Sequence, residues 1–153
     1  MRLSLFLLAA TALPAAAEIV PRDGTWTVRA MEAQMAEACP PMFQPMADAM
    51  VAQMGQRDVF EVDWPDAFDP NRASGLDPDG QPVAWERVDD TTWRAALSGP
   101  GTEAVIGTMQ VLSETEISNR VEMDIQKMME EQGGMVEAEG CTLSMTFLME
   151  LKD

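Results

Sequence analysis

Methionine thioethers are the most unusual chemical groups in this sequence, which contains 14 methionines. Four of them recur at every fourth position: Met42, Met46, Met50 and Met54. Met31 and Met35 precede them at the same spacing. On a helix this spacing makes one apolar stripe, whose simplest role is core packing, because methionine is flexible and fills gaps. Thioether sulfur also selects Cu(I), so the four residues 42, 46, 50 and 54 are an alternative metal site. An adaptable surface for a partner or lipid is a third interpretation.

The side chains used in most hydrolytic and metal sites are missing. The chain has no histidine and no tyrosine, which removes the usual general base, the commonest metal ligand and the histidine-dependent triads. Two cysteines are too few for an all-thiolate zinc site. Among 26 acidic residues, a carboxylate pair such as Asp63 with Asp66 is expected by chance. The sequence therefore predicts a protein that is not an enzyme and needs no cofactor.

The aromatic residues suggest a core or a pocket. The four tryptophans lie in segments that are expected to be strands: Trp26, Trp64, Trp85 and Trp93. Core packing is their simplest role, and the alternative is the lining of an apolar pocket. In that second case, Met46 and Met50 of the methionine stripe complete the predicted pocket.

Residues 1–17 resemble a secretory signal peptide. Arg2 precedes an apolar stretch from Leu5 to Leu13, and residues 15–17 are alanines that fit an A-x-A cleavage site. We therefore expect cleavage near Ala17, which leaves residues 18–153 as one domain in the periplasm or outside the cell. No later segment approaches about 18 consecutive apolar residues, so no membrane span is expected.

Export has a consequence for the two cysteines, Cys39 and Cys141. In an oxidising compartment an even number of cysteines favours a disulfide, and this one would close a loop of about 100 residues. A redox role favours close spacing such as C-x-x-C, which is absent. The sequence predicts a structural bridge that fixes the helical segment to the core side of the last strand.

The charge of the chain restricts its partners. The formal net charge is −16 at pH 7, from 10 basic and 26 acidic residues. Such a surface repels nucleic acid and anionic lipid, so neither is an expected partner. Solubility is the simplest role of this acidity, and capture of a cationic partner or a metal is the alternative.

Two segments near the C-terminus alternate apolar and polar residues, over residues 117–125 and 141–151. This period of two is typical of strands with one buried face. Shorter segments with strand character are 24–28, 58–64, 83–88, 92–97 and 104–112. Residues 83–88 and 92–97 are expected to form a hairpin around Asp89 and Asp90. The sequence thus predicts about seven antiparallel strands.

Helix-forming residues interrupt this pattern after the first strand. Residues 31–38 and 45–54 have helical composition, with Cys39, Pro40 and Pro41 between them, and Pro45 suits a first helical turn. Residues 126–140 are compatible with either helix or loop. The predicted fold is mainly β (α+β): a curved antiparallel sheet or partly closed barrel, with one or two short helices inserted after the first strand.

Gly24-x-Trp26 at the start of the first strand, followed by successive hairpins, resembles the opening of lipocalin-like β-barrels. The chain is also similar to small exported proteobacterial proteins of unknown function. The resemblance implies an apolar ligand and a packing role for Trp26. The chain departs from lipocalins in its helical insertion and in lacking an arginine in the last strand to pack on the tryptophan.

These observations predict an exported, soluble binding protein that holds an apolar small molecule or lipid fragment in a concave sheet. A Met-rich Cu(I)-binding protein is one alternative. An envelope interaction protein without a small ligand is the other. Nothing in the sequence indicates an oligomeric state.

Overall fold

The computed structural model describes residues 19–54, 58–74, 76, 83–98, 103–131, 133 and 138–152. Seven of its elements are strands: β1 (Gly24–Met35), β2 (Asp58–Val62), β3 (Glu86–Arg87), β4 (Thr92–Ala96), β5 (Val105–Ser113), β6 (Glu116–Asp124) and β7 (Thr142–Leu151). The others are a 3-10 turn, η1 (Pro41–Phe43), and two helices, α1 (Gln44–Met54) and α2 (Ile125–Glu131). The predicted signal peptide and its cleavage site near Ala17 lie outside the described residues.

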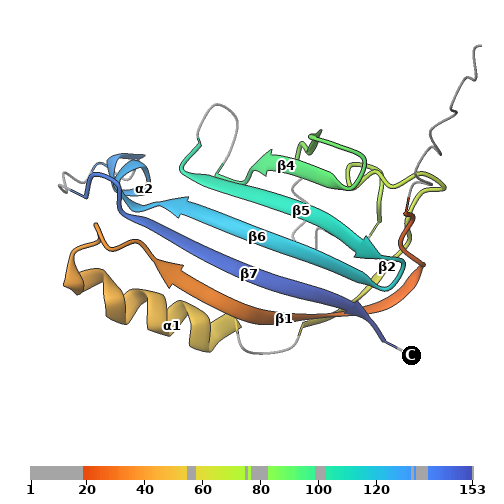
Figure 1. The fold of residues 1–153 in the computed structure, drawn as a ribbon, viewed down its shortest axis with the longest axis horizontal. Coiled ribbons are helices and arrows are strands. Elements are labelled where there is room, and N and C mark those ends of the chain that lie inside the picture. Colours follow the sequence, from red (N-terminus) through yellow and green to blue (C-terminus); the bar gives the residue numbers. More distant parts are fainter. Residues whose placement is uncertain are drawn as a thin grey trace, which may run out of the picture.

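All seven strands belong to one antiparallel sheet in the order β2-β1-β7-β6-β5-β4-β3 (Figure 1). The predicted number of strands and the hairpin around Asp89 and Asp90 are confirmed, but only Glu86 and Arg87 of the predicted strand 83–88 pair with β4. The sheet does not close into a barrel, because β2 and β3 lie at opposite ends of the strand order. Both end strands are short, and β2 pairs with only the first part of β1. Of the two predicted forms, the open sheet is therefore correct.

The first strand is longer than the sequence predicts. Residues 31–35 continue β1 and pair with β7, so the prediction of a helix over residues 31–38 is wrong there. The register shifts between Ala30 and Glu32, which leaves Met31 in a bulge with half of its surface exposed. After the bulge, Ala33 and Met35 alternate as in a strand. Pairing along the whole of β7 thus outweighs the local helix propensity.

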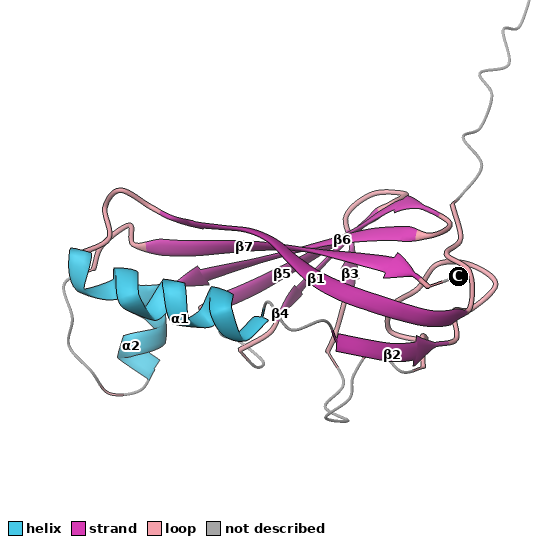
Figure 2. Ribbon diagram, turned by 90° about the horizontal axis from the view of Figure 1, so that it is seen from below, coloured by secondary structure: helices cyan, strands magenta, loops and turns pink. Residues whose placement is uncertain are grey.

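The helices lie on one side of the sheet (Figure 2). The prediction of a helix after the first strand is confirmed by α1, where Pro45 occupies the first turn. In the ambiguous region, α2 begins at Ile125, which the alternation had assigned to a strand. The Asp124 carboxylate accepts a hydrogen bond from the Lys127 N–H at 3.1 Å, as an N-cap does. Neither helix in the described part of the chain is long and apolar enough to cross a membrane.

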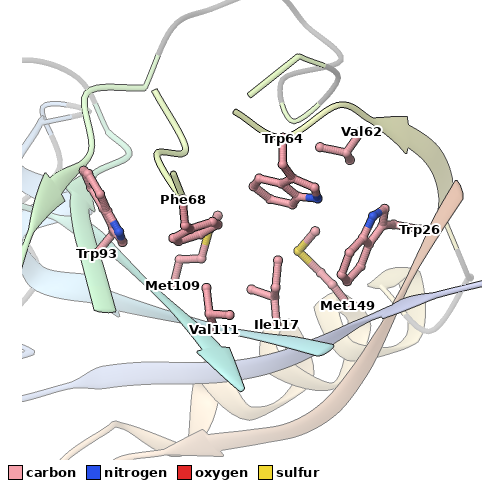
Figure 3. Packing of buried hydrophobic residues seen from close by; sticks show 9 residues of the cluster. All are labelled: Trp26, Val62, Trp64, Phe68, Trp93, Met109, Val111, Ile117 and Met149. Carbon is pink, nitrogen blue, oxygen red and sulfur yellow. The ribbon is translucent and has the colours of Figure 1, made fainter. Parts of the chain in front are cut away.

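The apolar residues of the strands gather on the face that carries the helices, here called the inner face. They form two clusters. The first, shown in Figure 3, lies toward one end and contains Trp26, Val62, Trp64, Phe68, Trp93, Met109, Val111, Ile117 and Met149. The second lies under α1 and α2 and contains Ala47, Met123, Ile125, Ala138, Cys141, Leu143 and Met145. The opposite, outer face carries the polar residues of the alternation, as predicted.

A disulfide joins Cys39 to Cys141 across 102 residues, as the sequence predicts. Cys39 lies in the turn between β1 and η1, and the fully buried Cys141 comes directly before β7. The backbone N–H of Ala36 donates to the carbonyl oxygen of Thr142 at 2.9 Å, so the bridge follows the end of the β1–β7 ladder. The disulfide therefore fixes the turn before the helix to the second cluster.

The hairpin between β3 and β4 provides a prediction about pH. The Asp89 carboxylate accepts hydrogen bonds from the Thr91 N–H at 2.8 Å and the Thr91 hydroxyl at 3.2 Å. The backbone hydrogen bond from Thr91 is the main cause that lowers the pKa of Asp89 below its ordinary value. The ionised carboxylate therefore stabilises the folded hairpin, and this stabilisation is fully present at pH values above the pKa of Asp89 in the unfolded chain. It is lost as the pH falls through the lower pKa of the folded state. An NMR titration of the Asp89 carboxyl should show the lowered pKa. Thr91→Val removes the hydroxyl and keeps the backbone N–H, so the pKa should rise only slightly and stay below the ordinary value. An Asp89 pKa at or above the ordinary value would contradict this.

Candidate functional site

One row of residues crosses the inner face where the first cluster meets the second. Cross-strand pairing aligns five residues from five adjacent strands: Ala30, Phe147, Asn119, Met109 and Trp93. We call them the central row. Met109 and Trp93 are buried, whereas Ala30, Phe147 and Asn119 are half-buried. The row is thus only partly covered over β1, β7 and β6.

Asn119 is the polar residue of this row. Its side chain lies on the inner face, where its neighbours across the ladders are Met109 and Phe147. Its amide nitrogen, Nδ2, donates to the Met149 sulfur at 3.2 Å. A thioether is a weak acceptor, so this contact uses only a small part of the hydrogen-bonding capacity of the amide. Asn119 therefore places an amide with spare hydrogen-bonding capacity in a partly covered region of an apolar surface.

A loop covers one end of the inner face. Residues 63–74 leave the end of β2 and return to it, since the Asp63 and Ser74 backbones exchange hydrogen bonds at 3.2 and 3.1 Å. Trp64 and Phe68 of this loop pack into the first cluster. At its far side the Asn71 amide bonds both backbone groups of Trp85, at 2.7 and 2.9 Å. The loop is therefore fastened at both edges of the sheet.

The rings of the first cluster form a continuous series across the sheet. The ring centroids of Trp26 and Trp64 are 5.9 Å apart, those of Trp64 and Phe68 5.2 Å, and those of Phe68 and Trp93 6.2 Å. The first and last of these contacts are edge-to-face, with interplanar angles of 79° and 82°. Edge-to-face pairs of this kind stabilise the cluster in addition to the contribution from buried apolar area.

The indole N–H groups of this series differ in their partners. Trp26 Nε1 donates to the Arg22 carbonyl oxygen at 3.1 Å. Nε1 of Trp64 and of Trp93 is buried without a hydrogen-bond partner in the described part of the chain, and each residue is only 8% exposed. In Figure 3 the Trp93 nitrogen lies on the side of its ring toward Phe68, and the Trp64 nitrogen lies toward Trp26. Edge-to-face contacts replace only part of a hydrogen bond, so both donors remain largely unsatisfied.

The fourth tryptophan, Trp85, packs against the first cluster from the start of β3 and is half-buried. It is not the cross-strand neighbour of Trp93, whose partner is Arg87. Trp64 and Trp85 lie just outside strands, so the prediction that all four tryptophans lie in strands is wrong for these two. The ring of Trp85 extends over Gly107 of β5, where an added Cβ would lie 3.2 Å from Trp85 Cη2 and 3.0 Å from Leu97 Cδ1.

Substituting valine for Gly107 is expected to displace Trp85 and to destabilise the protein by about 1–3 kcal/mol through overpacking. Denaturant unfolding measures the free energy, and a red shift of the tryptophan emission reports exposure of Trp85. Thr108→Val is the matched control, because Thr108 is the next residue of β5 and faces the opposite side of the sheet. Equal stabilities of the two variants would contradict the packing of Trp85 on Gly107.

The predicted methionine site is only partly assembled. Met42 lies in η1 and is 73% exposed, whereas Met46, Met50 and Met54 lie in α1 and their side chains are outside the described residues. Met31 and Met35 belong to β1, so the six methionines do not share one helix, contrary to the continuous helical spacing. In the described ranges, histidine, cysteine, aspartate and glutamate side chains form no group of three that could hold a metal ion.

The predicted pocket residues fall into two places. Trp26, Trp64, Trp85 and Trp93 all contribute to the first cluster, whereas α1, which carries Met46 and Met50, covers the second through Ala47. Asn119 is not among the residues that the sequence analysis singles out. The sequence does distinguish this residue, because Asn119 is polar and occupies a position of the β6 alternation that is otherwise apolar. No protein-family model, curated protein or solved structure matches this chain, so its function is inferred from its own residues.

Proposed function

We propose that this protein is an exported, non-enzymatic binding protein that holds an apolar small molecule or lipid fragment on the inner face of its sheet. The observation that carries the proposal is Asn119, a half-buried amide in the central row with a thioether as its hydrogen-bond acceptor. Ligand sites commonly combine an apolar lining with a few polar groups that fix orientation. Asn119 supplies the polar group, and Phe147 and Ala30 supply apolar surface beside it.

The coverage of the inner face supports this location. The loop of residues 63–74 covers one cluster, and α1 and α2 cover the other. Phe147, at the edge of the second cluster, is only half-buried and retains some exposed aromatic surface on this face. A ligand that lies along the central row would remove this surface from water, which is the main source of affinity for apolar molecules.

Native mass spectrometry of the protein taken from its own host tests the proposal first. An extra mass of several hundred daltons that is lost on organic extraction would support it. A bare chain, together with no change in tryptophan emission or melting temperature at saturating concentrations of apolar compounds, would contradict it. A smaller extra mass that a soft-metal chelator removes would favour Cu(I) instead.

Two adjacent residues of β7 provide a matched pair of variants. Phe147 faces the inner side and Leu148 the outer side, and both are half-buried. Phe147→Gln is expected to weaken binding at least about tenfold, because burial of an aromatic side chain contributes roughly 1.5–3 kcal/mol. Leu148→Gln should leave binding unchanged. Equal affinities of the two variants would place the ligand elsewhere.

A further inference from the structure

We infer that the ligand carries a neutral carbonyl oxygen, of the kind found in ketones and acyl esters, and that the indole N–H of Trp93 donates to it. This inference rests on the proposed function and specifies its ligand class. It starts from the two buried indole donors, Trp64 Nε1 and Trp93 Nε1, which have no hydrogen-bond partner among the described residues. A buried donor without an acceptor is unfavourable and rare in native proteins. We therefore expect a bound molecule to supply the acceptor.

No group in the described part of the protein accepts a hydrogen bond from these two donors. The buried residues there include no polar or charged side chain, so an internal acceptor would have to be a backbone carbonyl or a thioether sulfur. Trp26, by contrast, is even more deeply buried and has its N–H satisfied by the Arg22 carbonyl. Burial in this cluster is therefore compatible with a complete hydrogen bond, and Trp64 and Trp93 differ from Trp26 in lacking one.

Trp93 is the better placed of the two. It lies in the central row, separated from Asn119 by Met109 alone. Trp64 lies on the covering loop, and its nitrogen is directed toward Trp26 in Figure 3. The Trp93 nitrogen is directed toward Phe68 of the same loop, and both residues are buried, so the ligand must displace the Phe68 ring to reach this donor from Asn119.

The acceptor is expected to be neutral. A buried carboxylate needs a paired cation, and the described part of the inner face has no buried charged side chain. The net charge of −16 also disfavours an anionic ligand. A carbonyl oxygen accepts an indole N–H without either cost, and the apolar chain of the ligand can lie over Phe147 and Ala30, beside the Asn119 amide.

Three probes of equal chain length test the inference: methyl nonyl ketone, the alkene in which a methylene group replaces the ketone oxygen, and undecanoate. The wild-type protein should bind the ketone about tenfold more tightly than the alkene, as one added hydrogen bond provides. Undecanoate should bind more weakly than the ketone. Equal binding of ketone and alkene, or tighter binding of undecanoate, would overturn the inference and leave the proposed function intact. If none of the three binds, the proposed function fails as well.

Trp93→Phe removes the donor and keeps an aromatic ring. In this variant the ketone should lose its advantage while the alkene binds as before, which also shows that the site is intact. Trp85→Phe is the matched control, and it should keep the preference for the ketone, because Trp85 Nε1 is not one of the buried unpaired donors. A ketone preference that survives in Trp93→Phe would overturn the assignment of the donor.

A second measurement does not depend on the folding of a variant. NMR spectra of the wild-type protein resolve the indole N–H groups of its four tryptophans. The ketone should move the Trp93 indole proton downfield relative to the alkene, because hydrogen bonding deshields it. Identical Trp93 shifts with the two probes would overturn the inference.

Discussion

Replacing Cys39 and Cys141 together by alanine is expected to lower the free energy of unfolding by about 4–5 kcal/mol. The bridge spans 102 residues, so its removal greatly enlarges the conformational freedom of the unfolded chain. Removal of the disulfide also affects the folded state, because the bridge fixes the turn after β1 to the buried residue that precedes β7. Such a change is comparable with the whole stability of a marginal domain.

Denaturant unfolding of the double variant and of the oxidised wild type measures this difference. The wild type in the presence of reductant is the control and should approach the double variant. Intact-mass measurement of the oxidised protein should show the loss of two hydrogen atoms relative to the reduced chain. A stability difference under about 1 kcal/mol would contradict the entropic account.

Trp26→Ala is expected to destabilise the protein by about 3–5 kcal/mol, the usual range for removing a buried tryptophan. Trp26 is completely buried and contacts Trp64 edge-to-face in the first cluster. Its truncation also leaves the Arg22 carbonyl oxygen without the indole donor at 3.1 Å. Denaturant unfolding measures the free energy.

Trp85→Ala is the appropriate comparison for Trp26→Ala, because the same atoms are removed from a half-buried position. We expect a clearly smaller destabilisation there, since less apolar surface returns to water. Trp26→Phe should lie between the wild type and Trp26→Ala, because it keeps a ring and loses the hydrogen bond. Equal effects of the two alanine substitutions would show that Trp26 is not central to the first cluster.

The two substitutions with the largest expected effects on stability affect opposite ends of the inner face. The disulfide belongs to the second cluster and Trp26 to the first. β1 and β7 nevertheless pass through both, because they pair from Trp26 with Leu151 to Met35 with Leu143. Both substitutions are therefore expected to destabilise the same cooperative unit, and each variant should unfold in a single transition.

Much of the fold could be predicted because the relevant signals are local. Alternation over residues 141–151 and 117–125 predicts one buried face, and the structure places residues 142–151 in β7 and 117–124 in β6, with Leu143, Met123 and Ile117 buried. Two cysteines in an expected oxidising compartment predicted the bridge that the structure contains. Pro45 at a first helical turn predicted the start of α1 closely.

The secondary-structure predictions were wrong where contacts between residues far apart in the sequence outweighed the local helix or strand propensity. Residues 31–35 have helix-forming composition, and yet they extend β1, because β7 offers a complete ladder of backbone partners. Ile125 continues the alternation of β6, but Asp124 caps a helix there instead. Neither outcome follows from a window of neighbouring residues.

Three properties are readable from the chain without its fold: the alternation that gives each strand an apolar and a polar side, the cysteine pair, and the lack of histidine and tyrosine. These properties depend on residue types and on spacing along the chain. The tertiary structure alone decided that the sheet stays open and that loop 63–74 covers one end. It also decided that Asn119 and Trp93 share a row. Strand order and register bring together residues far apart in sequence, and they depend on the total pairing and burial of the whole chain.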